Sequence, residues 1–194
     1  MLKTTAMIMD ELKEYANPGA KLRRMVKSGE YTKVIRGLYE TDSSVSGYLL
    51  AGSIYGPSYL SFDFALSFYG MIPETVYTFT SATYDKKKKK FFDTPFGNFS
   101  YQDVPKDVYP YEISFASEGE YTFQIATPEK AICDKLYAIR PVRSIRGMTQ
   151  LLIEDLRINE EILRTLDVGK IENMADKYHT TNVDILIKAL KRIR

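Results

Sequence analysis

The chain has 194 residues, of which 44% are hydrophobic and 27% are charged, and this composition excludes wholesale disorder. Its formal net charge of +2 is too small to mark the whole chain as a polycation. Cys133 is the single cysteine and His179 the single histidine, so the sequence excludes an intramolecular disulfide and a zinc site built from four Cys and His ligands.

Two further features concern the location of the protein. No stretch of the sequence approaches the roughly 18–20 uninterrupted apolar residues that a membrane helix needs. The first residues, 1–4, also lack the charged and then apolar layout of a signal peptide. We therefore expect a cytoplasmic protein with no membrane partner.

The small net charge conceals an uneven distribution along the chain. Residues 1–40 carry eight basic and five acidic residues, residues 41–126 six and ten, and residues 127–194 thirteen and ten. The strongest local excess lies in residues 17–36, where six basic residues face one acidic residue, Glu30. A local charge of this size attracts phosphates even when the whole molecule is nearly neutral.

The first segment predicts two short helices separated by a break. Apolar residues recur at helical spacing over residues 5–15, and Asn17-Pro18-Gly19 then interrupts the pattern. A second helix is expected from Pro18 or Gly19 to Ser28, with Gly29 as its left-handed terminator. One face of this helix is apolar and is expected to be buried; its residues are Leu22, Met25 and Val26.

A hairpin is predicted after the basic helix, with strands at residues 31–35 and 38–41 around the turn Arg36-Gly37. Helix, break, basic helix and hairpin is the order of a winged helix-turn-helix, so we predict such a DNA-binding domain over residues 1–42. The alternative is a solvated basic helix with no role in nucleic-acid binding. The expected contacts with major groove and backbone come from the helix and the wing, and they are Lys21, Arg23, Arg24, Lys27, Lys33 and Arg36.

The rest of the chain, residues 43–194, predicts a larger mixed α/β domain. Helices are expected at residues 45–55 and 58–69, a helix start at Thr127-Pro128-Glu129, and helical structure from Ser144 onward. An antiparallel-rich sheet is expected from the alternating segments 75–81, 89–93, 99–103, 111–115 and 121–126. The fold class is therefore α+β.

Two conspicuous compositional features have structural explanations. The run Lys86–Lys90 lies between two strand signals, where lysines commonly protect an edge or a hairpin, so we expect a solvated loop in preference to a phosphate site. The 15 tyrosines and 10 phenylalanines fall mainly at core-like positions. Cys133 lies near the apolar face of its helix, which indicates a buried, inert thiol.

Several runs of this sequence resemble the AbiEi family of antitoxins and transcriptional regulators of type IV toxin–antitoxin systems. They are Arg36-Gly37-Leu38-Tyr39, Gly56-Pro57-Ser58-Tyr59-Leu60-Ser61, Tyr69-Gly70-Met71-Ile72-Pro73-Glu74 and Thr127-Pro128-Glu129-Lys130-Ala131. The resemblance covers roughly residues 15–140 in order, whereas the tail after about residue 145 matches only in being helical. The sequence departs from the fuller family pattern in having a single short helix before the basic helix.

The resemblance implies two activities, and we expect no catalysis, cofactor or metal. One is autorepression, in which the N-terminal domain binds promoter DNA. The other is neutralisation of a co-encoded nucleotidyltransferase-like toxin by the larger domain, without a stable complex. The candidate antitoxin residues are those of the family-like run, Ser58, Tyr59, Ser61 and Asp63.

Two alternatives remain. A metal-dependent nuclease would use Asp63, Glu129 and Lys130, since carboxylates hold Mg²⁺ and a lysine can orient the attacking water. The spacing argues against it, because all three residues are expected in helices or caps and such sites usually place a carboxylate and a lysine on one strand. The second alternative is a non-catalytic interaction module whose aromatic domain binds a protein.

Overall fold

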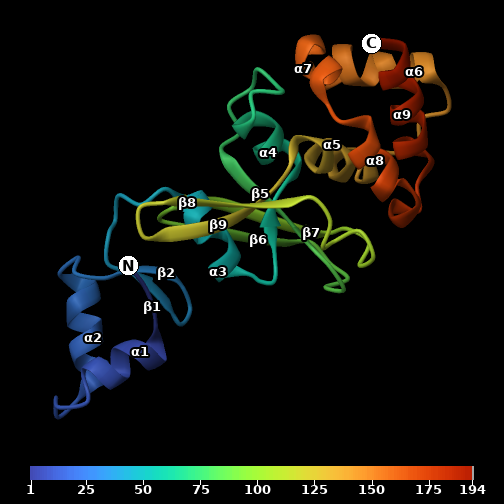
Figure 1. Ribbon diagram of the computed structural model, residues 1–194. Helices are drawn as coiled ribbons and strands as arrows, with labels where there is room; N and C mark the ends of the chain where they lie inside the picture. The colour runs from blue at the N-terminus through green and yellow to red at the C-terminus, as the bar shows by residue number, and fades with distance from the viewer. Residues whose placement is uncertain (194) are drawn as a thin grey trace.

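A computed structural model describes residues 1–193 of the chain, which form an α+β protein with two separate β-sheets. Figure 1 shows a small N-terminal unit at one end, a larger sheet in the middle and a group of C-terminal helices at the other end. The N-terminal helices therefore lie far from the C-terminal helices.

The N-terminal unit contains two helices and a three-stranded antiparallel sheet. Its elements are β1 (Leu2–Thr4), α1 (Thr5–Glu11), α2 (Pro18–Lys27), β2 (Thr32–Ile35) and β3 (Leu38–Glu40). The predicted helices and hairpin are confirmed, with α1 shorter than expected. Strand β1 was not predicted; it pairs with β3, so that the strand order is β1-β3-β2.

The larger sheet has six strands in the order β6-β7-β5-β4-β9-β8. The strands are β4 (Tyr59–Leu60), β5 (Thr78–Thr83), β6 (Lys90–Thr94), β7 (Gly97–Asp103), β8 (Ile113–Glu118) and β9 (Tyr121–Ala126). Three pairings are antiparallel and two are parallel, so the sheet is mixed, with an antiparallel majority. All five predicted strands are present, with ends shifted by up to three residues.

Two predicted helices of the middle segment differ from the structure. The segment 45–55 forms a 3₁₀ turn (Gly47–Leu50) followed by the short α3 (Ala51–Ile54). The prediction of one helix over 58–69 was wrong in its first part, because residues 59–60 form β4 in the middle of the sheet and α4 (Phe62–Phe68) begins only afterwards. A short apolar run fits a buried strand as well as a buried helix, and here pairing with β5 and β9 decides.

Helices cover both faces of the larger sheet. On one face, the Tyr101 hydroxyl of β7 donates to the carbonyl oxygen of Ala51 in α3 at 2.7 Å. On the other face lie α4 and α5 (Pro128–Tyr137), and the remaining helices pack beyond α5 (Figure 1). These are α6 (Ile145–Gln150), a π-helical turn (Leu151–Asp155), α7 (Glu160–Thr165), α8 (Val168–Ala175), a 3₁₀ turn (Asp176–Tyr178) and α9 (Thr181–Ile193). Within residues 1–193, no helix is long and apolar enough to cross a membrane.

The aromatic residues of the middle segment form a packed cluster where the two-residue strand β4 ends. The Tyr48 ring lies 5.2 Å from that of Phe123 and 5.7 Å from that of Phe64, and the Phe64 ring lies 5.3 Å from that of Phe79. These centroid separations are those of packed aromatic side chains. The interpretation of most aromatic residues as core is therefore confirmed here.

Gly47 is required by this packing. A Cβ atom at this position would lie 2.1 Å from the carbonyl oxygen of Phe96 and 2.4 Å from the Phe79 ring. We expect Gly47→Ala to lower the free energy of unfolding by at least about 2 kcal/mol, because backbone and core must shift to admit the methyl group. The matched control is Gly52→Ala in α3, where a Cβ meets nothing within 4 Å. Equal stability of the two variants in urea unfolding would contradict this account of Gly47.

Candidate nucleic-acid interface

Helix α2 has well-defined ends and a buried underside. The Asn17 side chain caps it by accepting from the Ala20 N–H at 2.9 Å, and Pro18 takes its first turn. Gly29, with φ of +81°, ends it. As predicted, Leu22 and Met25 are buried, and Val26 packs at the margin of a small core that contains Ile8, Leu12 and Tyr31.

Burying this face directs the opposite face of α2 to solvent. Arg23, Arg24 and Lys27 are all exposed there. Lys21 is half-buried, with its Nζ 5.3 Å from the centre of the Tyr15 ring. The ion pairs of this unit lie elsewhere, between Lys3 and Glu11, between Lys13 and Asp10 and between the Met1 amino group and Glu40, so within residues 1–193 no carboxylate neutralises the three exposed cations of α2.

The hairpin adds two exposed cations. Lys33 lies on β2 opposite Tyr39 of β3, and Arg36 occupies the turn before Gly37, whose φ is +88°. Of the six predicted DNA contacts, five are thus exposed, three on α2 and two on the hairpin that follows it in the chain, and Lys21 is half-buried. We name the exposed set Arg23, Arg24, Lys27, Lys33 and Arg36 the N-terminal cationic surface.

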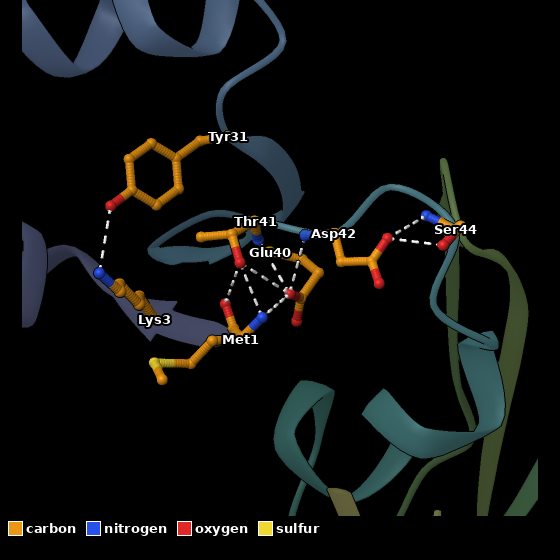
Figure 2. Close-up of polar contacts among 7 residues, drawn as sticks. All are labelled: Met1, Lys3, Tyr31, Glu40, Thr41, Asp42 and Ser44. Carbon is orange, nitrogen blue, oxygen red and sulfur yellow. Dashed lines mark hydrogen bonds and ion pairs between the residues drawn. The ribbon is translucent and has the colours of Figure 1, made fainter. Parts of the chain in front are cut away.

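Glu40 connects this small unit to the larger domain and was not singled out from the sequence. Its side chain is fully buried, and Figure 2 shows its Oε1 facing the amino group of Met1, which donates to it. The backbone N–H groups of Thr41 and Asp42 donate to the same oxygen at 2.8 and 3.1 Å. Burial alone would raise the pKa of Glu40, but these donors hold it below its ordinary value.

Glu40 also acts on the larger sheet. Burial and the neighbouring Glu40 carboxylate raise the pKa of the Tyr121 hydroxyl at the start of β9. Asp42, in the connection that follows Glu40, accepts from the backbone N–H and the hydroxyl of Ser44 at 2.8 and 2.6 Å (Figure 2). The link between the two units is thus fixed by charge-assisted hydrogen bonds.

Two of the candidate antitoxin residues belong to a buried polar centre in the larger domain. The Tyr59 hydroxyl and the Ser61 hydroxyl both donate to Oδ2 of Asp134, at 2.9 and 2.6 Å. The Tyr178 hydroxyl donates to Oδ1 of Asp134 at 2.6 Å. Burial raises the pKa of both tyrosines well above the ordinary value, and the Asp134 carboxylate adds to the shift. This centre joins β4, α5 and the turn before α9.

Lys130 completes the centre. It is fully buried, donates to the carbonyl oxygen of Val108 at 2.8 Å and lies 3.4 Å from Oδ1 of Asp134. Burial lowers the pKa of Lys130, and Asp134 opposes this change. Sequence reasoning missed Asp134 and Tyr178, although Lys130 and Asp134 stand four residues apart in a helix whose neighbouring residues are apolar, a spacing that could have indicated the pair.

The three residues of the nuclease alternative have separate partners. Asp63 is partly exposed and pairs with Lys135 at 2.6 Å. Glu129 accepts from the backbone N–H of Asp167 at 3.0 Å, whereas Lys130 belongs to the buried centre. Within residues 1–193 no group of three or more His, Cys, Asp or Glu side chains is arranged to hold a metal ion.

The remaining predicted positions have simple surroundings. Ser58 is buried next to β4, with no hydrogen-bond partner for its hydroxyl among residues 1–193. Cys133 is fully buried as expected, and burial raises the pKa of its thiol. The His179 imidazole is exposed, and its Nε2 lies 3.8 Å from the exposed carboxylate of Asp107.

Comparison of the chain with protein-family models and with curated protein sequences returns no match.

We expect the buried centre to be essential for stability. Asp134→Ala should lower the free energy of unfolding by about 3–5 kcal/mol. The substitution leaves the Lys130 ammonium without its buried carboxylate, and the hydroxyls of Tyr59, Ser61 and Tyr178 without their acceptor. Asp63→Ala removes a partly exposed partner and should cost less than about 1 kcal/mol. Chemical unfolding of both variants tests this. Equal decreases in the free energy of unfolding would show that the buried centre contributes no more to stability than the exposed ion pair.

Glu40 should contribute stability that depends on pH. Because its pKa is lowered in the folded state, its contribution is present above the ordinary pKa of 4.5 and is lost as the pH falls through the folded value. Glu40→Gln should therefore lower the free energy of unfolding at pH 7 by about 1.5–3 kcal/mol. The difference in the free energy of unfolding between the variant and the unsubstituted protein should become markedly smaller near pH 3. A gap that is independent of pH would contradict this role.

Proposed function

We propose that the chain is a promoter-binding autorepressor and the antitoxin of a type IV toxin–antitoxin system. The observation that carries the repressor part is the N-terminal cationic surface. Exposed guanidinium and ammonium groups without carboxylate partners can neutralise phosphates and reach base edges, and one α-helix fits the major groove.

The arrangement around α2 supports a winged-helix interpretation of residues 1–42. Two consecutive helices pack on a small sheet, and the β2–β3 hairpin follows the basic helix as a wing would. β1 adds a third strand to this sheet. This strand supports the hairpin and offsets the absence of a further helix before α1, which was the departure from the family pattern.

The antitoxin part rests on the resemblance of residues 36–39, 56–61, 69–74 and 127–131 to the AbiEi family. Two of these runs, 56–61 and 127–131, contain Tyr59, Ser61 and Lys130, which converge on Asp134. Their shared role in the fold is that of a buried scaffold. We infer that the surface that opposes the toxin is carried by this scaffold, and that Asp63 is the candidate on it that solvent reaches.

The repressor proposal predicts loss of binding without loss of folding. Arg24→Ala with Lys27→Ala should abolish the gel shift of DNA taken from immediately upstream of the chain's own reading frame, because both side chains are exposed and unpaired. Lys188→Ala with Arg192→Ala removes the same charge from α9 and should leave the shift intact.

The salt dependence gives a second readout of the same contact. With about four to six phosphates neutralised, log K should fall with log salt at a slope near −4 to −5 for the unsubstituted protein. If the variant with Arg24→Ala and Lys27→Ala still binds DNA with an unchanged salt slope, α2 is not the element that contacts the DNA.

The antitoxin proposal is tested separately. Expression of an adjacent nucleotidyltransferase-like reading frame should arrest growth, and co-expression of this chain should restore it. The Arg24 and Lys27 double variant should also restore growth, since toxin neutralisation is assigned to residues 43–194. Failure of the unsubstituted chain to restore growth would refute the antitoxin assignment while leaving the repressor assignment open to its own test.

A further inference from the structure

A second cationic surface lies on the larger domain, at the sheet edge formed by β6 and β7. Two adjoining hollows of about 280 and 370 Å³ share Lys89 and Gln102 in their linings. Together they form a groove between this edge and the end of α5. We call it the lysine groove and define it by Lys87, Lys88, Lys89, Phe91, Gln102 and Tyr137.

The β5–β6 loop presents its lysines in a fixed arrangement. The backbone N–H of Lys87 donates to Oδ2 of Asp103 at 2.6 Å, and Oδ1 of the same carboxylate accepts from the Thr83 hydroxyl at 2.7 Å. Lys86 turns away, donating to the carbonyl oxygen of Gly56 at 3.1 Å. The loop is therefore anchored at both Lys86 and Lys87.

The lysines that follow are free to bind a ligand. Lys87, Lys88 and Lys89 are exposed, and among residues 1–193 none of their ammonium groups pairs with a carboxylate. Two carboxylates also line the hollows: Asp63 forms an ion pair with Lys135, whereas Asp103 accepts only neutral donors from the loop and from Thr83. Three lysines against the one carboxylate that no cation neutralises leave the described lining with a net charge of +2.

An exposed aromatic ring lies beside these charges. Phe91 on the edge strand β6 is 71% exposed and lines the same hollow as Lys89. Tyr137, at the end of α5, lines the adjoining hollow with Lys87 and Lys88 and is 37% exposed. Gln102 lines both hollows, and its side-chain amide can donate and accept hydrogen bonds there.

We propose that the lysine groove binds single-stranded nucleic acid, with lysines on the phosphates and Phe91 stacked on a base. Cations that follow a backbone, combined with exposed aromatic rings, are how proteins bind single strands without strong sequence preference. A duplex fits this combination poorly, because its bases are stacked on one another and do not offer a face to Phe91. The groove is independent of the N-terminal cationic surface, which belongs to the other unit of the molecule (Figure 1).

The test is fluorescence anisotropy with the full chain carrying Arg24→Ala and Lys27→Ala, which remove two of the three exposed cations of α2. The probes are labelled oligouridylate and oligodeoxyuridylate of about twelve nucleotides, within the roughly 4–16 that such a site covers, and they differ only in the sugar. The proposal predicts saturable binding of a single strand, weakened about tenfold by Phe91→Ala.

Matched controls separate stacking and charge from general effects. Phe115→Ala removes an equally exposed phenylalanine, also 71% exposed, from the opposite edge strand β8 and should not change the affinity. Lys87→Gln with Lys88→Gln should make the slope of log K against log salt less steep by about 1.4, since each single-strand phosphate contact contributes about 0.7. Lys188→Gln with Arg192→Gln should leave the slope unchanged.

Three results would overturn the proposal. They are no saturable binding of either single strand, equal affinities of the Phe91→Ala and Phe115→Ala variants, and tighter binding of a duplex of the same length that survives Phe91→Ala. Preference for the ribose or the deoxyribose probe identifies whether RNA or DNA is the natural strand. Because Phe91 is mostly exposed, its substitution should leave the melting temperature unchanged, and a melting curve verifies this.

Discussion

The burial of Leu22 and Met25 beneath α2 is the constraint on which the N-terminal unit depends. Each buried side chain of this size contributes about 1.5–3 kcal/mol, and the cluster beneath α2 is small: among residues 1–193 its other buried members are Ile8, Leu12 and Tyr31. Because α2 buries one face against this core, its opposite face, with Arg23, Arg24 and Lys27, is exposed to solvent. The packing of the apolar face of α2 therefore determines which cations the N-terminal unit presents to a ligand.

The two halves of the molecule treat charge in opposite ways. In the larger domain, Lys130 and Asp134 are removed from solvent and satisfied by each other, by hydroxyls and by a carbonyl group, so their charges fix β4 against α5. On the N-terminal cationic surface the charges have no carboxylate partner among residues 1–193 and are available to a ligand. Between the halves, the buried Glu40 orders the connecting segment through local hydrogen bonds, and Val34 and Leu38 of the hairpin pack into the core of the larger domain.

Local patterns predicted much of this fold. The helix start at Thr127, the terminator Gly29 and the alternation at 121–126 depend on neighbouring residues, and each is where it was predicted. The two strands that were missed, β1 and β4, have three and two residues, and their existence depends on distant partners. The buried centre was invisible for the same reason, since Tyr59, Asp134 and Tyr178 meet only after folding, and Glu40 gave no local signal at all.

The account is tested most directly by hydrogen–deuterium exchange of the full chain with and without the DNA upstream of its reading frame. It predicts that added duplex slows exchange in α2 and in the β2–β3 hairpin, residues 18–40, while α6 to α9 exchange as before. Protection confined to the larger domain, with residues 18–40 unchanged, would contradict the central claim that this surface meets the duplex.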